Sequence, residues 1–139
     1  MNQGLRNPLP RALTVLLPAA VASALWAGWL GWDQHQDVLP DGSVSGPYEA
    51  WQVAGLVLTL LVPVCWAAAR RSVAGAVVGP TAGLTVAACY DWSDDSSGLF
   101  VVGVGLVMMG SLLGTSGVSA VVMRLTAPAC AARPAPRRR

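Results

Sequence analysis

The fold is decided by residues 51–90, WQVAGLVLTLLVPVCWAAARRSVAGAVVGPTAGLTVAACY, where two uncharged stretches, 51–69 and 72–90, flank the single charged pair Arg70 and Arg71. About 20 residues of helix cross a hydrocarbon core of about 30 Å. Lipid offers the backbone no hydrogen-bonding partner, so an apolar stretch of this length is expected to be helical. The segment therefore predicts two membrane-spanning helices joined by a tight turn.

Two further uncharged stretches, 12–32 and 99–123, lie on either side of this segment. Hydrophobic residues make up 54% of the chain and charged residues 12%, whereas a soluble domain has about 25% charged residues. The chain therefore has too little polar surface for a water-soluble globule. We expect an all-α fold, a four-helix transmembrane bundle with spans at about 12–32, 51–69, 72–90 and 99–123.

The charges separate completely between alternate connections. Every basic residue is an arginine, and all lie before the first span, between the second and third, or after the fourth: Arg6, Arg11, Arg70, Arg71, Arg124, Arg133, Arg137, Arg138 and Arg139. Every acid lies in the two other connections: Asp33, Asp37, Asp41, Glu49, Asp91, Asp94 and Asp95. Basic segments stay cytoplasmic. This predicts an up-and-down antiparallel bundle with both termini cytoplasmic, anchored by Arg6, Arg11, Arg70, Arg71 and Arg124.

The same pattern divides the chain into segments. Residues 1–11 form a cytoplasmic N-terminus, 12–126 the transmembrane domain with outer loops 33–50 and 91–98, and 127–139 a basic, disordered tail of Pro, Ala and Arg. The absence of Lys and the many Ala, Gly and Val residues indicate a high-GC bacterial genome, hence the bacterial plasma membrane. Residues 1–24 also resemble a cleavable signal peptide. Because the apolar run continues to Trp32, a retained helix is the favoured of the two alternatives.

Small residues recur at a spacing of four in three spans. Helices in lipid associate by close backbone approach, which small residues permit. These residues are therefore predicted to form helix-packing faces, within the chain or between copies: Gly75, Gly79, Gly83 and Ala87 in the third span, Ala20, Ala24 and Gly28 in the first, and Gly110 and Gly114 in the fourth. The stripe of Ser111, Thr115 and Ser119 predicts interhelical hydrogen bonds, with a narrow pore lining as the alternative.

The sequence offers little that could carry chemistry. No ionisable residue lies inside a predicted span. Proton-coupled transporters usually carry the proton on such a residue, so the sequence does not indicate one. No nucleophile–base pair and no CxxC motif occurs, and His35 is the single histidine. We therefore expect no enzyme, no cofactor, no metal site and no nucleic-acid binding. Asp33, His35 and Asp37 are interpreted as a solvated acidic loop, and cation binding there is left open.

Two outer segments, residues 46–52 (GPYEAWQ) and 93–103 (SDDSSGLFVVG), resemble those of small uncharacterised four-span integral membrane proteins of actinobacteria. The resemblance implies a membrane location and a four-helix architecture. That group has no established activity, so the resemblance implies no functional residue.

These observations favour a non-enzymatic membrane subunit or scaffold. Its partners would be membrane lipid and either further copies of itself or another membrane protein, held through the Gly and Ala helix faces. The alternative is a small oligomeric channel or transporter for a neutral solute.

Overall fold

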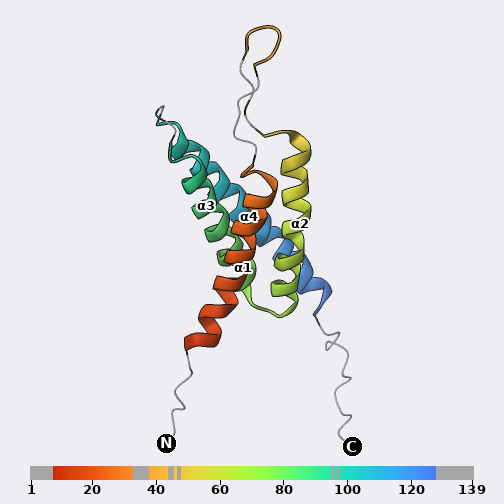
Figure 1. Ribbon diagram of the computed structural model, residues 1–139. Helices are drawn as coiled ribbons and strands as arrows, with labels where there is room; N and C mark the ends of the chain where they lie inside the picture. The colour runs from red at the N-terminus through yellow and green to blue at the C-terminus, as the bar shows by residue number, and fades with distance from the viewer. Residues whose placement is uncertain are drawn as a thin grey trace, which may run out of the picture.

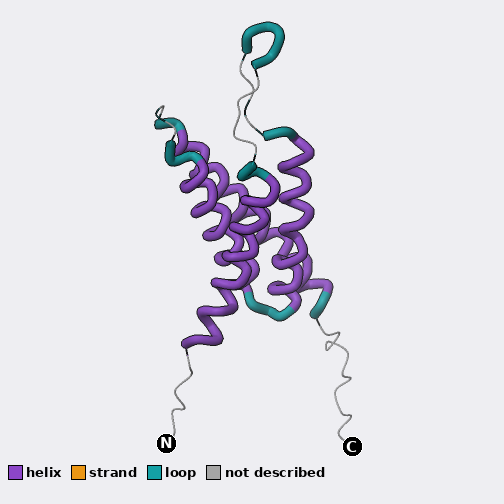
Figure 2. Tube along the Cα trace, viewed as in Figure 1, coloured by secondary structure: helices purple, strands orange, loops and turns teal. Residues whose placement is uncertain are grey.

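The computed structural model describes residues 8–32, 38–43, 46, 48–94, 96 and 98–127 (Figure 1). The described chain is built from helices joined by loops (Figure 2), which confirms the predicted all-helical fold. Of these helices α1, α2 and α4 are long and apolar enough to cross a membrane. The elements are α1 (Pro8–Trp29), α2 (Ala50–Ala69), the π-helix η1 (Ala74–Val78), α3 (Gly79–Asp91) and α4 (Phe100–Leu125).

Successive long helices alternate in direction. α1 and α3 run upward in Figure 1, while α2 and α4 run downward. The arrangement gathers Arg70, Arg71 and Arg124 where α2 and α4 end, and we call this the arginine end. Glu49 and Asp91 lie at the opposite, acidic end, where α2 begins and α3 finishes. The described charges are therefore separated along the length of the bundle.

The third apolar stretch is a π-helix followed by a short α-helix. Pro80 has no N–H, and in an α-helix its ring would clash with the carbonyl of Ala76. The wider turn of η1 lies directly before this proline, and the Gly79 N–H donates to the Ala74 carbonyl, five residues back. The helix therefore accommodates Pro80 by widening into a π-turn, and α3 has 13 residues.

The turn at the arginine end closes α2 with a left-handed residue. Arg71 has a φ of 57°, its N–H donates to the Ala68 carbonyl (2.9 Å), and the Ser72 N–H donates to the Ala67 carbonyl (3.0 Å). This is the Schellman pattern, in which glycine is the usual left-handed residue. An arginine in that conformation costs about 1–2 kcal/mol. The positive charge of Arg71 in this turn is therefore accompanied by strain in the backbone of the same residue.

The buried side chains form two clusters along the bundle axis. The larger includes Trp26, Leu56 and Leu84, from α1, α2 and α3. The smaller consists of Ala67, Ala68 and Ala76 near the arginine end, with Val122 of α4 packed against it. Small residues dominate there, so α2, η1 and α4 converge closely.

The closest helix contact joins α1 and α3 through glycine. A Cβ added at Gly79 would lie 2.7 Å from the Val15 carbonyl oxygen and 2.9 Å from Pro18 Cβ. A Cβ at Gly83 would overlap the Ala19 carbonyl oxygen. The Ser23 hydroxyl also donates to the Gly83 carbonyl at 3.0 Å. The two backbones touch because the interface has no side chains between them.

We predict that Gly83→Ala lowers the free energy of unfolding by about 1–3 kcal/mol, since the new methyl must push α1 away. Thermal or dodecyl-sulfate unfolding of the detergent-solubilised protein measures it. Gly105→Ala is the matched control, because nothing lies within 4 Å of its added Cβ, and alanine favours the helix by about 1 kcal/mol. An equal loss in both variants would contradict the predicted clash.

Candidate functional site

The predicted packing residues fall into two groups. Gly75, Gly79 and Gly83 are buried against α1, and Ala87 is half-buried beside the larger core cluster. The residues predicted on α1 and α4 are exposed or face open space: Ala20, Ala24, Gly28, Gly110 and Gly114. Instead of the Ala20–Gly28 series, α1 places Thr14 against η1, and Val15, Pro18 and Ala19 against α3. Within the chain, only the third-span series meets another helix closely.

The predicted anchors at the arginine end are exposed where the structure describes them. Arg70 caps α2, Arg71 follows it, and Arg124 lies in the last turn of α4. Arg6 lies outside the described residues, and so does the side chain of Arg11. The tail arginines and the Asp33–Asp37 loop are also outside them.

A carboxylate surrounded by aromatic side chains lies at the acidic end. Asp91 Oδ2 accepts hydrogen bonds from Trp26 Nε1 (3.2 Å) and from the Tyr48 hydroxyl. That hydroxyl in turn accepts from Trp92 Nε1 at 3.0 Å. The apolar pattern predicts Asp91 as the first residue of an outer loop, but the structure makes it the last residue of α3. We call Trp26, Tyr48, Asp91 and Trp92 the aromatic–acid cluster.

The rings of this cluster pack edge to face. The ring centroids of Trp26 lie 6.3 Å from Tyr48 and 5.8 Å from Trp92, with interplanar angles of 79° and 70°. Such T-shaped pairs add about 0.5–1.5 kcal/mol beyond the area they bury. Gly103 leaves room on α4 for the Trp92 ring, which a Cβ would approach to 2.8 Å. The cluster thus fastens α1, the start of α2, the end of α3 and α4 together.

A second indole links α1 to α2. Trp29 Nε1 donates to the Thr59 hydroxyl at 3.1 Å, and that hydroxyl donates to the Gly55 carbonyl at 2.8 Å. The Trp29 ring occupies the space that a Cβ on Gly55 would fill. Nearby, the fully buried Gln52 accepts the Glu49 N–H at 2.6 Å and so caps the start of α2. The acidic end is therefore held together by large, mostly apolar side chains whose polar atoms form hydrogen bonds between and within the helices.

A groove of about 490 Å³ runs between α2 and α4. Trp26 and Tyr48 lie at its acidic end, and Leu56, Leu84 and Val107 are among the apolar residues along it. Gly110 and Gly114 line its α4 side. The residues that line the groove are mostly apolar, like those of the core. An apolar occupant therefore suits the groove better than a hydrated solute.

The hydroxyl stripe of α4 does not bond across helices as predicted. The Ser111 hydroxyl donates to the Val107 carbonyl (2.6 Å) and the Thr115 hydroxyl to the Ser111 carbonyl (2.7 Å), both within α4. The Ser119 and Thr81 hydroxyls are buried and have no hydrogen-bond partner among the described residues. The prediction of interhelical bonds is therefore wrong for Ser111 and Thr115.

Titratable and metal-binding groups do not combine into a reactive centre in the described part of the chain. No group of three His, Cys, Asp or Glu side chains there could hold a metal ion. Cys65 and Cys89 are free thiols. The pKa of Asp41, in the loop before α2, is lowered chiefly by the hydrogen bond from the Ser43 hydroxyl and then by that from the Ser43 N–H. That loop keeps its negative charge at neutral pH.

The aromatic–acid cluster is what sequence reasoning missed. Its contacts join residues 43 to 65 positions apart, and a single sequence does not reveal such pairs. The available indication was the gathering of Tyr48, Asp91 and Trp92 at the predicted outer boundary, where such rings are enriched. That pattern predicts how deep these side chains lie in the membrane, but it does not predict which residues they contact.

Comparison with protein-family models, with curated proteins and with solved structures finds no match to this chain.

We predict that Tyr48→Phe lowers the free energy of unfolding by about 1.5–3 kcal/mol, the usual value of a hydrogen bond to a charged group. The variant removes one of the two side-chain donors to Asp91, leaving that of Trp26, and it removes the hydroxyl that accepts from Trp92. Thermal unfolding in detergent, followed by tryptophan fluorescence, measures the change. Tyr90→Phe is the control, since that side chain is 85% exposed. Equal stability of Tyr48→Phe and wild type would rule out a structural role for the cluster.

Proposed function

We propose that the chain is a multi-pass integral membrane protein that acts as a non-enzymatic subunit or scaffold. The observation that carries the membrane assignment is the outward-facing apolar surface of the three long helices. Only 11% of the most apolar 18-residue window of α4 and 17% of the α1 span are buried inside the bundle. Large side chains such as Leu58, Val62, Leu106 and Leu113 are more than 60% exposed. A lipid solvent accounts for this surface, whereas water does not.

The fourth span of this proposal is formed by η1 and α3 together. Helical structure is continuous from Val73 to Asp91, which is close to the length that a bilayer core requires. A single π-turn is acceptable in lipid because neighbouring helices enclose it. Gly75, Ala76 and Val77 are all buried.

The orientation follows from the separation of charge. With Arg70, Arg71 and Arg124 at one end and Glu49, Asp91 and Asp94 at the other, the positive-inside tendency places the arginine end in the cytoplasm. Both termini are then cytoplasmic, and the bacterial plasma membrane is the proposed location.

The orientation is tested with single cysteines in a chain whose native cysteines, Cys65, Cys89 and Cys130, are replaced by alanine. We expect a membrane-impermeant maleimide to label Ser93→Cys in intact cells and Arg71→Cys only after permeabilisation. The reverse order of labelling would overturn the proposed topology.

The subunit role is supported by the small-residue faces that the chain itself leaves open. Gly28, Gly110 and Gly114 have nothing within 4 Å of an added Cβ, and Ala20 and Ala24 are exposed. In lipid, such faces allow a further helix to approach closely. Association through the Gly110–Gly114 face of α4 is the specific form of the proposal.

A channel or transporter for a neutral solute is less well supported. Its path would need hydroxyls free to replace water around the solute. The groove between α2 and α4 is mostly apolar, and its hydroxyls, Ser111 and Thr115, already donate to carbonyls of their own helix.

We expect Gly110→Leu with Gly114→Leu to reduce self-association at least about tenfold, because the added bulk keeps a second helix from close packing. Crosslinking in native membranes, or energy transfer between labelled copies in vesicles, measures it. Gly105→Leu is the matched control: it is also unobstructed and lies about 140° around the helix from Gly110 at 100° per residue. If both variants associate like wild type, this face is not the contact.

A further inference from the structure

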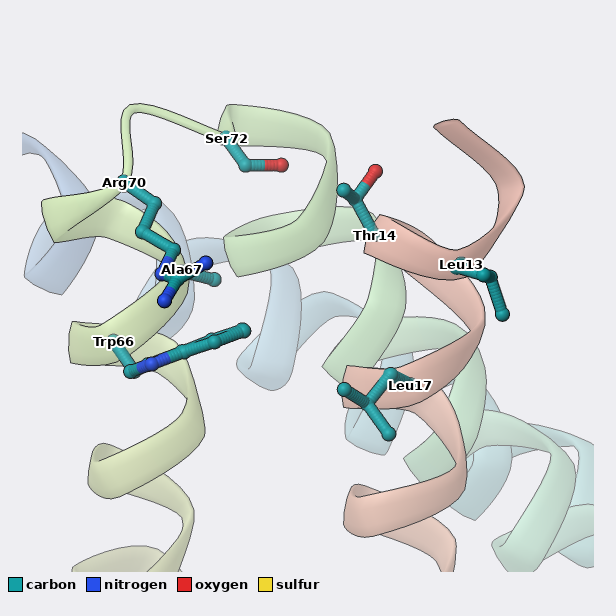
Figure 3. Close-up of a pocket in the computed structure, with 7 residues that line it drawn as sticks. All are labelled: Leu13, Thr14, Leu17, Trp66, Ala67, Arg70 and Ser72. Carbon is teal, nitrogen blue, oxygen red and sulfur yellow. The ribbon is translucent and has the colours of Figure 1, made fainter. Parts of the chain in front are cut away.

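A second cavity, of about 580 Å³, lies at the arginine end between α1 and α2 (Figure 3). Leu13, Thr14 and Leu17 line it from α1. Trp66, Ala67 and Arg70 line it from α2, and Ser72 from the turn that follows. Ser72 lies at the turn, and the Arg70 side chain folds back from the turn so that its guanidinium lies beside Ala67 and over the Trp66 ring (Figure 3). The cavity therefore combines one charged group with apolar walls.

The Arg70 guanidinium has no anionic partner in the part of the chain that the structure describes. The Arg70 guanidinium carbon lies 4.3 Å from the centroid of the Trp66 ring. This cation–π stacking holds the guanidinium by its face, which leaves the in-plane N–H groups for another ligand. Among the described residues no ion pair is formed, because the described acids lie outside the arginine end. Planar N–H donors of this kind suit the oxygens of a phosphate.

Ser72 adds a second donor to the lining of the cavity. Its hydroxyl oxygen accepts the Gly75 N–H at 3.2 Å, which fixes the side chain at the start of the π-helix. No described residue accepts its hydroxyl proton, so the O–H can donate to an oxygen of a ligand. The guanidinium lies over Trp66 on the α2 side, and the Ser72 hydroxyl points towards the α1 side (Figure 3), so the cavity has donors on two sides.

The inner walls indicate a ligand with an apolar part. Leu13 and Leu17 are 61% and 54% exposed, and Trp66 is 47% exposed. A free phosphate ion would leave these three side chains uncovered, whereas an acyl chain would cover them. Basic pockets between membrane helices on the cytoplasmic side are suited to anionic lipid headgroups.

A second copy of this chain does not fit the mouth of the cavity. All seven acids of the sequence lie in segments 33–50 and 91–98, which the fold places away from the arginine end where it describes them. Copies inserted in one orientation would therefore bring arginine, not carboxylate, to the cavity. None of the described acids can therefore supply an anion to this cavity.

We propose that this cavity binds one anionic phospholipid, with its phosphate at Arg70 and Ser72 and an acyl chain along Leu13, Leu17 and Trp66. The site rests on the proposed membrane location. It gives the chain a lipid requirement at its cytoplasmic face, beyond the general solvation of its surface.

The test uses the full chain in a neutral detergent and counts retained lipids by native mass spectrometry. The probes are phosphatidylglycerol, the zwitterionic phosphatidylcholine, and glycerol 3-phosphate as a headgroup without acyl chains. Wild type should retain one phosphatidylglycerol in preference to phosphatidylcholine and should not retain glycerol 3-phosphate. Comparable binding of glycerol 3-phosphate would overturn the lipid in favour of a soluble phosphate compound.

Arg70→Gln should weaken phosphatidylglycerol binding about tenfold, as expected for losing a charge-assisted contact. Arg71→Gln is the matched control, since it removes the same charge from the next residue, which does not line the cavity, and its affinity should change less than about twofold. An equal loss in the two variants would mean attraction to the arginine end in general and would overturn a built site.

Leu17→Trp tests the cavity without changing any charge, because its bulk occupies the acyl-chain wall. Loss of the retained lipid in this variant supports the site, and unchanged retention contradicts it. Helical circular dichroism and the need for detergent are measured in every variant. A chain that stays soluble without detergent refutes the membrane assignment itself, whereas a detergent-dependent, helical chain without lipid preference refutes only the lipid site.

Discussion

Two helices in lipid gain little by pressing leucine against leucine, because the surrounding acyl chains offer each the same contact. What remains is how closely their backbones approach. In this protein that constraint is met where η1 and α3 lie on α1, with Gly75, Gly79 and Gly83 beneath the carbonyls of Thr14, Val15 and Ala19. Because α3 is placed by this contact, its far end brings Asp91 within reach of Trp26 and Tyr48.

The two ends of the bundle solve different problems. At the acidic end, indole and phenol groups from separate helices converge on one carboxylate, so polar atoms are satisfied by each other. At the arginine end the cations face outward and remain without carboxylate partners among the described residues. Arg71 has a left-handed backbone conformation that glycine would adopt with less strain. An arginine at this position indicates that the positive charge of this end matters more than the backbone strain. The polar groups of the acidic end thus bind one another, whereas those of the arginine end are available to a ligand.

Much of the architecture could be predicted from composition and charge alone. Long uncharged stretches predict helices, and α1, α2 and α4 have the length and apolarity to cross a membrane. The third stretch was harder, because a proline at position 80 predicts a disturbance without saying whether the helix kinks or widens. Small residues at a spacing of four predict a packing face but not its partner. The series on η1 and α3 meets α1, whereas no described atom lies within 4 Å of a Cβ added at Gly110 or Gly114. Contacts between residues 43 to 65 apart, such as those of Asp91, lie beyond what periodicity can reveal.

The π-turn before Pro80 has a consequence for alignment. Residues four apart on an α-helix are displaced by about 40° around its axis at each step, so a glycine series gradually rotates away from a straight neighbour. A turn closed by bonds to the fifth residue back winds less per residue and reverses part of that rotation between Gly75 and Gly79. The π-turn therefore compensates for the rotation of the glycine series around the helix axis. As a result Gly75, Gly79 and Gly83 all face α1 over more than two turns.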